Sequence, residues 1–461
     1  MVSPVLDYPI NTAVNELIAR ERGIFLKRQP RSTEFIARAR EHLAGGVTSN
    51  WQIAQPQAVW MSHGAGSKVF DVDGNEYVDM HGGYGVSIAG HAHPAIVAAV
   101  SDRVRRGTHF AQPTDDAIWV AAELGRRFGL PLWRFGNSGT EATMDAVHLM
   151  RAVTQRDLII KVEGCYHGHH DSVQVSVLPD ADEIGPRERP TAVAGNSGIP
   201  SAIRDLVVVV PFNDLGAVER ALAEHRARIA GMILEPIMMN AGIIAPEPGY
   251  LAGLRALLHA EGALLAFDEV KTGFTTGPGG ATARYGVVPD LVCLAKALGG
   301  GVAVAAIGGT AKLMSAIADG TYEQVGTFNG NPLAMAAARA NLGEVLTPHG
   351  YTHLDRLAAA LRAEIEQTIA DAELPWHVVS IGAKGCITFR AEPVREYRDF
   401  LEVDARFGEA HWLVQHNGGV FLPPWGKVEQ WLLSVQHDES DVARFARNFA
   451  GLVSALTPPK Y

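Results

Sequence analysis

Two apolar segments of the chain each end in a side chain that can do chemistry. Residues 263–267 read ALLAF and lead into Asp268, and residues 291–295 read LVCLA and lead into Lys296. A lysine amine forms a Schiff base with the aldehyde of pyridoxal phosphate, and a carboxylate keeps the pyridine nitrogen of that cofactor protonated, so that the ring accepts electrons. We therefore interpret Asp268 and Lys296 as the catalytic pair of a pyridoxal phosphate enzyme.

Lys271 is the alternative Schiff-base lysine, because it follows Asp268 closely in the segment DEVK. Two residues on one strand end cannot easily approach a flat ring from opposite sides, and this favours Lys296. The spacing by itself leaves both lysines open.

A candidate phosphate site follows residues 135–137. Ser138, Gly139 and Thr140 stand directly before a predicted helix. Backbone N–H groups and hydroxyls at a helix N-terminus bind anions, and the cofactor's phosphate is one. The alternative is an ordinary N-cap, which Ser and Thr form often. No Gly-Lys-Ser/Thr follows, so a nucleotide P-loop is not supported.

Residues 163–171, EGCYHGHHD, combine an aromatic ring with several possible metal ligands. Tyr166 can stack on a planar ring. His167, His169, His170 and Asp171 invite a metal interpretation, but they lack a helical His-x-x-x-His pair or any zinc spacing. Ordinary buried or solvated histidines are the alternative that we favour.

The segments around these residues predict an α/β fold with a mostly parallel sheet. Apolar strands alternate with helices between residues 90 and 310. Continuous apolar strands indicate a sheet covered on both faces, and ligands of such sheets bind beyond the carboxyl ends of the strands. The predicted strands are 158–162, 206–210, 231–234, 263–267 and 291–294, and the predicted helices include 140–152 and 249–260.

The flanking regions predict a second, smaller α+β domain. Residues 13–44 are expected to be helical, and Asp73-Gly74-Asn75 indicates a hairpin turn. Helices at 334–346 and 354–370 precede a β-rich stretch, 376–435. The expected division is an N-terminal segment of the small domain (1–75), a large cofactor-binding domain (76–332) and the C-terminal small domain (333–461). Residues 179–203 form a long loop, either an active-site lid or a disordered segment.

Composition narrows the class of protein. The 461 residues carry a net charge of −10 and are 47% hydrophobic. Without clustered Lys and Arg, nucleic acid is not an expected partner, and no apolar run reaches the length of a membrane span. Three scattered cysteines do not form a disulfide framework, and the N-terminus does not read as a signal peptide. We expect a cytoplasmic enzyme that acts on small molecules.

Five segments occur in an order that is specific for one family. Together they resemble the class III pyridoxal phosphate-dependent aminotransferases, in particular the branch that contains glutamate-1-semialdehyde aminomutase. The resemblance covers about residues 40–440. The segments are 137–144 (NSGTEATM), 163–169 (EGCYHGH), 267–274 (FDEVKTGF), 289–296 (PDLVCLAK) and 326–335 (GTFNGNPLAM).

The resemblance implies a role for each residue around the cofactor ring. Lys296 would be the Schiff-base lysine and would carry the proton between the substrate carbon and the cofactor. Asp268 would pair with the pyridinium. Val270 and Tyr166 would cover the two ring faces, and Asn240 would lie near the 3-hydroxyl group.

The resemblance also implies the assembly and the fold. Ser138, Gly139 and Thr140 would hold the phosphate, and Thr327 would reach the phosphate of a partner subunit. This arrangement requires a homodimer with shared active sites. The implied architecture is the fold type I transferase, with a large domain around the parallel sheet and a smaller α+β domain.

The chain departs from the aminomutase pattern at residues 45–52, GGVTSNWQ. Gln52 stands where the mutases carry an arginine for the substrate carboxylate, and an amide does not replace a bidentate guanidinium. Trp51 adds bulk beside it, and Tyr84 matches an aromatic pocket position of the family. These three residues are the candidate substrate contacts.

The C-terminal region offers further candidates near the substrate. Glu429 matches a glutamate of the family's pocket-closing strand. Lys427 is the cation of that segment, and Trp425 and Trp431 either line the pocket or pack between domains. Arg390 and Arg406 are candidates for binding a keto-acid carboxylate only because they lie in the same domain.

The function that we predict is transamination by a ping-pong mechanism. An amine or β-/aryl-amino acid would donate its amino group and a keto acid would accept it. The alternative is glutamate-1-semialdehyde 2,1-aminomutase, and decarboxylating or racemising chemistry is possible on the same fold. A catalytically silent binding protein is disfavoured, because all of the cofactor residues are present together.

Overall fold

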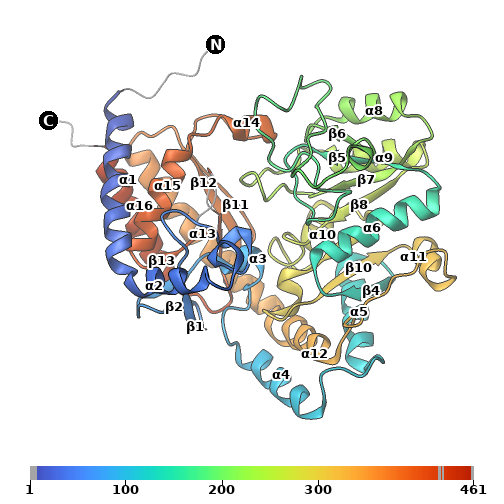
Figure 1. Ribbon diagram of the computed structural model, residues 1–461, viewed down its shortest axis with the longest axis horizontal. Helices are drawn as coiled ribbons and strands as arrows, with labels where there is room; N and C mark the ends of the chain where they lie inside the picture. The colour runs from blue at the N-terminus through green and yellow to red at the C-terminus, as the bar shows by residue number, and fades with distance from the viewer. Residues whose placement is uncertain (1–7, 424–426, 428–429, 458–461) are drawn as a thin grey trace.

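The computed structural model of the protein describes residues 8–423, 427 and 430–457. Figure 1 shows two regions side by side: a large sheet with its covering helices, and a second region where the first and last helices of the chain pack together. Within the described residues, no helix is both long and apolar enough to cross a membrane.

The large region is built on a seven-stranded sheet that is parallel except for one strand. Only β10 runs antiparallel to its neighbours, β4 and β9. The predicted mostly parallel α/β sheet is confirmed. In spatial order the strands are β4 (Leu132–Gly136), β10 (Ala305–Gly309), β9 (Leu291–Leu294), β8 (Leu264–Asp268), β7 (Ile229–Leu234), β5 (Leu158–Val162) and β6 (Val207–Val210).

The strands are apolar throughout because both faces of the sheet are buried. Successive side chains of a strand point to opposite faces. On β5, Ile159 packs in the core beneath α6, whereas Ile160 packs in the core beneath α8 and α9. On β8, Ala266 and Phe267 divide in the same way. The helices that cover or border this sheet are α5 (Asp115–Phe128), α6 (Gly139–Thr154), α8 (Leu215–Glu224), α9 (Tyr250–Ala260), α10 (Gly280–Tyr285) and α11 (Ala311–Ala318).

The second region joins both ends of the chain. α1 (Tyr8–Arg28) packs on α15 (Ala405–Asn417), and α16 (Glu439–Leu456) packs on α13 (Pro348–Asp371). The predicted hairpin forms between β2 (Lys68–Asp71) and β3 (Glu76–Asp79). Its strand β3 pairs in parallel with β13 (Val420–Phe421). The domain boundaries themselves stay a prediction.

Short elements complete the fold. β1 (Met61–Ala65) lies at the edge of the hairpin sheet, and β11 (His377–Ile381), β12 (Lys384–Thr388) and β14 (Gln430–Leu432) form a separate antiparallel sheet. The remaining helices are α2 (Pro30–Ala39), α3 (Gly82–Gly85), α4 (Pro94–Arg106), α7 (Ser201–Arg204), α12 (Pro332–Ala340) and α14 (Tyr397–Leu401).

The prediction that residues 376–435 are β-rich is wrong in part. α14 and the 13-residue α15 occupy the middle of this stretch. Asp404 accepts a hydrogen bond from the backbone N–H of Arg406 and thereby caps α15. On α15, Trp412 packs on Phe25 of α1 and His411 packs on Phe445 of α16, so tertiary packing decided the helix.

The predicted loop at residues 179–203 is largely irregular and is attached to α14. The Tyr397 hydroxyl donates to the Pro179 carbonyl at 2.7 Å. Arg398 donates to the Gly185 carbonyl at 2.9 Å and pairs with the buried Glu163 at 2.9 Å. These contacts tie the loop to the small domain; the lid function stays a prediction.

Gly231 on β7 is a position where the sheet tolerates no side chain. An added Cβ would lie 2.5 Å from the Leu264 carbonyl oxygen and would also overlap the Met150 sulfur. We expect Gly231→Ala to lower the free energy of unfolding by roughly 1–3 kcal/mol through overpacking. Urea unfolding followed by circular dichroism measures this change.

Gly451→Ala is the matched control, because a Cβ at Gly451 in α16 would meet no atom within 4 Å. Alanine has the higher helix propensity, so this variant should gain up to about 1 kcal/mol. Equal stability of the two variants would contradict the packing assigned to β7.

Candidate active site

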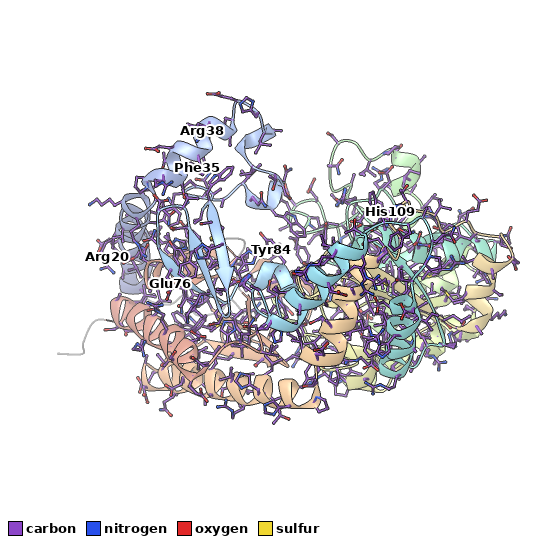
Figure 2. All side chains as sticks on the ribbon, turned by 90° about the horizontal axis from the view of Figure 1, so that it is seen from below. Arg20, Phe35, Arg38, Glu76, Tyr84 and His109 are labelled. Atoms are coloured by element: carbon purple, nitrogen blue, oxygen red, sulfur yellow. The ribbon has the colours of Figure 1, made fainter. Side chains whose placement is uncertain are left out.

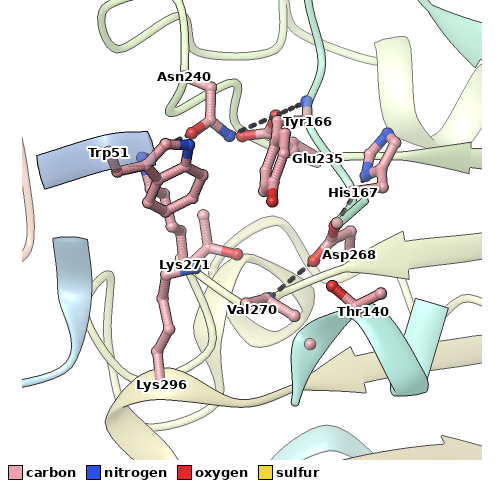
Figure 3. A pocket seen from close by; sticks show the side chains of 13 residues that line it. Trp51, Thr140, Tyr166, His167, Glu235, Asn240, Asp268, Val270, Lys271 and Lys296 are labelled. Atoms are coloured by element: carbon pink, nitrogen blue, oxygen red, sulfur yellow. Dashed lines mark hydrogen bonds and ion pairs between the residues drawn. The ribbon is translucent and has the colours of Figure 1, made fainter. Parts of the chain in front are cut away.

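A pocket opens at the carboxyl ends of β8 and β9, and Figure 3 shows the residues that line it. Asp268 is the last residue of β8, and Lys296 stands two residues beyond the end of β9. Asp268 is paired with Cys293 across the two parallel strands. The prediction that Asp268 and Lys296 lie together at neighbouring strand ends is therefore confirmed, and their catalytic roles stay a prediction.

Asp268 is a buried carboxylate held from two sides. His167 Nδ1 donates to its Oδ2 at 2.7 Å, and the backbone N–H of Val270 donates to its Oδ1 at 2.9 Å. The Asp268 side chain is 4% exposed, and His167 is fully buried. These two bonds compensate the desolvation of the carboxylate and direct it into the pocket.

Lys296 is a buried amine at a strained backbone position. Its φ of +46° is unusual for a residue with a Cβ. The Asn341 amide donates to the carbonyls of Ala297 and Leu298, at 2.7 and 3.1 Å, and holds the turn that follows. Burial lowers the pKa of Lys296, and Asp268 opposes this shift. A lowered pKa increases the share of the amine that is neutral and nucleophilic.

Lys271 also lines the pocket, but its amine is engaged with the neighbouring wall. Its Nζ donates to the Met239 carbonyl at 2.8 Å and to Asn240 Oδ1 at 2.7 Å. Burial, followed by the charges of Lys384 and Lys296, sets the pKa of Lys271 well below its ordinary value. The structure thus gives Lys271 fixed partners, whereas Lys296 faces Asp268 across the pocket.

The N-terminus of α6 borders the pocket through Gly139 and Thr140. Ser138 is the N-cap: its Oγ accepts from the Glu141 N–H at 3.2 Å, and Glu141 Oε2 accepts from the Ser138 N–H at 2.9 Å. A Cβ at Gly139 would lie 2.9 Å from a methyl group of Val270, so this approach requires glycine. The first-turn N–H groups have no helical acceptor and are available to an anion.

Aromatic side chains form another wall. The Trp51 ring lies 5.2 Å from the ring of Tyr166 and 4.9 Å from that of Tyr84, centroid to centroid. The Tyr84 hydroxyl donates to the Trp51 carbonyl at 3.1 Å. Figure 2 shows Tyr84 near the centre of the molecule, next to the N-terminal strands. Trp51 and Tyr166 line the pocket. Tyr84 is not among the lining residues and contacts Trp51 instead.

Gln52 does not line the pocket. Its Oε1 accepts from the backbone N–H and the hydroxyl of Thr48, at 3.0 and 2.7 Å, and the residue is exposed. Short local hydrogen bonds thus hold this side chain against its own turn.

Glu235 is a pocket residue that sequence reasoning missed. Its carboxylate accepts from the N–H groups of Tyr166 and Met239 and from the Asn240 side chain, at 2.9, 2.8 and 2.8 Å. The residue is 3% exposed and directly follows β7. An acid after a buried strand was the same signal that identified Asp268, and it could have identified Glu235.

Thr327 lies away from the pocket of its own chain. The residue is exposed, and its carbonyl accepts a hydrogen bond from His109 Nε2 at 2.7 Å. His169 and His170 hydrogen-bond to the hydroxyls of Thr140 and Thr143, at 3.2 and 3.3 Å. Across residues 8–423, 427 and 430–457, no group of three or more His, Cys, Asp or Glu side chains is arranged to hold a metal.

The C-terminal candidates do not line the pocket where they are described. Lys427 donates to the Leu401 carbonyl, and Trp431 is fully buried in the core. Arg390 donates to the Asp399 carbonyl at 2.6 Å, and Arg406 pairs with Asp404 at 2.6 Å. Trp425 and Glu429 lie outside the described residues.

The residues present fit pyridoxal phosphate. The buried carboxylate of Asp268 can face a protonated ring nitrogen, and the amine of Lys296, whose pKa is lowered, can attack an aldehyde. The close approach of Gly139 to Val270 leaves a helix N-terminus open to a phosphate. Tyr166 provides an aromatic face on the same pocket (Figure 3).

Known proteins resemble this chain over most of its length. The family Aminotransferase class-III matches residues 52–428. A glutamate-1-semialdehyde 2,1-aminomutase of Thermomicrobium roseum is 39% identical over 412 residues, which are 88% of this chain and 94% of that protein.

Solved structures agree with these matches. A glutamate-1-semialdehyde aminomutase from Pseudomonas aeruginosa PAO1 in complex with PMP has a TM-score of 0.89 and 31% identity, covering 96% of this chain and 99% of that one. An omega-transaminase from Sphaerobacter thermophilus has a TM-score of 0.87 and 34% identity, covering 92% and 97%. The predicted fold type I architecture and the predicted cofactor are confirmed.

The lowered pKa of Lys296 predicts how the apoenzyme takes up its cofactor. Only the neutral amine attacks the aldehyde, so the uptake rate rises with pH and levels off below the ordinary lysine value of 10.5. Stopped-flow absorbance of the apoenzyme mixed with pyridoxal phosphate measures this profile. In Asp268→Asn the carboxylate no longer favours the ammonium form, so the plateau should move to lower pH. A plateau at or above 10.5 in the native chain would contradict the assigned environment.

Proposed function

The chain belongs to the class III aminotransferases and uses pyridoxal phosphate, and from this premise we propose that it is a ping-pong transaminase. The amino donor is an amine or a β-/aryl-amino acid, and the acceptor is a keto acid. Lys296 is the lysine that binds the cofactor.

The composition of the pocket wall carries this proposal. Trp51 contributes an indole ring, and Tyr166 lies beside it. Among the described lining residues there is no arginine, and Gln52 is turned away toward Thr48. An aromatic wall without a guanidinium suits an apolar or aryl group better than a second carboxylate.

Glutamate-1-semialdehyde 2,1-aminomutase is the second candidate. The 39% identity to the Thermomicrobium roseum mutase over nearly all of both chains favours it. A mutase needs no separate amino acceptor, and this requirement separates the two candidates.

The chain's residues divide the chemical work. When bound, the cofactor supplies an aldehyde that takes the amino group and a ring that accepts electrons. Lys296, whose pKa is lowered by burial, would remove the proton from the substrate carbon and deliver it to the cofactor carbon on the other side of the shared nitrogen. Asp268, positioned by His167, keeps the ring nitrogen protonated. Tyr166 and Val270 hold the two faces of the ring.

The phosphate is held by the first turn of α6, through Ser138, Gly139 and Thr140. Asn240 lies near the 3-hydroxyl group. Thr327 reaches the phosphate of a partner subunit, so the active unit is a homodimer. The large exposed side chains beside Thr327 support this assembly, since Val325 is 82% and Phe328 58% exposed.

The location that we propose is the cytoplasm. Cys165, Cys293 and Cys386 are all buried and unpaired. Free thiols persist in a reducing compartment.

The deciding experiment mixes the holoenzyme with single amines in the absence of keto acid and follows the cofactor spectrum. We expect a β-aryl-β-amino acid or one enantiomer of an aryl-alkyl amine to convert the cofactor to its aminated form rapidly. Glutamate and alanine serve as comparison donors. If no amine reacts while glutamate-1-semialdehyde isomerises without an acceptor, the mutase is the correct function.

Lys296→Ala is expected to abolish turnover, because no other described lysine faces Asp268 without fixed partners. Turnover with the best amine of the panel, and cofactor release on denaturation, measure the effect. Lys271→Ala is the comparison: it should keep the cofactor bound through Lys296. Full activity of Lys296→Ala would transfer the assignment to Lys271.

A further inference from the structure

Lys271 brings a second amine into the pocket without a negatively charged partner. Both groups that accept its hydrogen bonds are uncharged: the Met239 carbonyl and the Asn240 side-chain oxygen. Within the described part of the chain, no carboxylate lies within ion-pair distance of its Nζ. Lysine has three N–H donors, so one stays available beyond these two bonds.

A residue from the C-terminal part of the chain, Gln430, also helps to position the Lys271 amine. Gln430 Nε2 donates to the Met239 carbonyl at 2.7 Å, so Met239 bridges Gln430 and Lys271. The amide oxygen of Gln430 accepts from Lys384 Nζ at 3.2 Å, and Lys384 is 2% exposed. Lys271 lines the pocket and the charge of the buried Lys384 acts on it, so an oxyanion that enters on this side would find a positive field.

The stem of Lys271 runs close to that of Lys296. Both pass Gly85: a Cβ built on Gly85 would lie 3.7 Å from Lys296 Cδ and 3.9 Å from Lys271 Cγ. Both lysines line one pocket, so a substrate whose reacting carbon lies at Lys296 shares that pocket with the amine of Lys271.

We propose that Lys271 is the specificity residue that binds the substrate carboxylate, in place of the cation missing at Gln52. The proposal rests on the transaminase function in one respect, namely that a keto acid brings the carboxylate. A single lysine is a point charge without the bidentate fork of arginine, so it tolerates α- and β-carboxylates at slightly different positions.

Carboxylate binding at Lys271 is coupled to a proton. Burial and the neighbouring lysines lower the pKa of the free amine, and a carboxylate beside it would raise that pKa again. At pH values above the lowered pKa, binding of a carboxylate takes up a proton. The groups that act on the amine, by charge or as a nearby titrating side chain, are Lys384, Lys296, Glu235, Asp268 and His81.

The test compares two unreactive probes, 3-phenylpropanoate and its uncharged amide, on the holoenzyme by isothermal titration calorimetry. We expect Lys271→Gln to weaken binding of 3-phenylpropanoate about tenfold, the usual effect of losing a charge-assisted hydrogen bond. Binding of the amide should weaken less than about twofold. Proton uptake by the native enzyme, measured in buffers of different ionisation enthalpy, should disappear in the variant.

Lys312→Gln is the matched control, because Lys312 is exposed on α11. It should leave both probes unchanged. Lys384→Gln removes a buried neighbouring cation that does not line the pocket, and it should weaken the carboxylate less than Lys271→Gln does. Thermal unfolding verifies that each variant folds. If Lys271→Gln does not fold, Lys271→Met takes its place in the test.

Two results would overturn the proposal. One is an equal loss of affinity for both probes in Lys271→Gln, which would mean that Lys271 only shapes the pocket. The other is unchanged carboxylate binding with a shifted pH midpoint of the cofactor absorbance, which would assign Lys271 to an oxygen of the cofactor. Because neither probe is turned over, these results stand even if the amine panel favours the mutase.

Discussion

The site depends on holding a carboxylate in place where there is little water. Asp268 is 4% exposed, and an isolated charge at such a position is unstable. His167 Nδ1 and the Val270 N–H compensate with two directed hydrogen bonds, at 2.7 and 2.9 Å. In the proposed function, the place of this carboxylate sets where the ring nitrogen of the cofactor would lie relative to Lys296.

The sheet provides the precision that this arrangement needs. β8 and β9 are adjacent and parallel, so their ends present Asp268 and Lys296 to one pocket. α6 packs on the same sheet, and its N-terminus reaches the pocket through Gly139. Because both faces of the sheet are buried, these elements cannot shift independently without opening the core.

The substrate side of the pocket is assembled from segments that are distant in the sequence. Trp51 comes from the N-terminal segment, and Gln430 reaches the same region from the C-terminal sheet. Between them, Glu235, Asn240 and Lys271 form a continuous chain of hydrogen bonds. The wall at the ends of β8 and β9 therefore comes from one sheet, whereas the opposite wall joins three parts of the chain.

The amino-acid sequence by itself determined the cofactor chemistry. Asp268 and Lys296 were predictable as candidates because each follows a short apolar run between helical segments, and the resemblance to the family chose Lys296 over Lys271. The capping role of Ser138 was also readable, since it depends only on the next turn of chain. Both inferences use interactions between residues close in sequence, together with one general rule about parallel sheets.

Only the tertiary structure decided which side chains face the substrate. Gln52 turned to Thr48, Lys271 turned to Asn240, and Arg406 paired with Asp404 rather than reaching the pocket. The stretch expected to be β-rich became helical in α15 because of its packing against α1 and α16. The partner of Lys271 comes from a segment that is distant in the sequence, which the local pattern does not contain, whereas Gln52 and Arg406 took partners within their own turns instead of the predicted substrate.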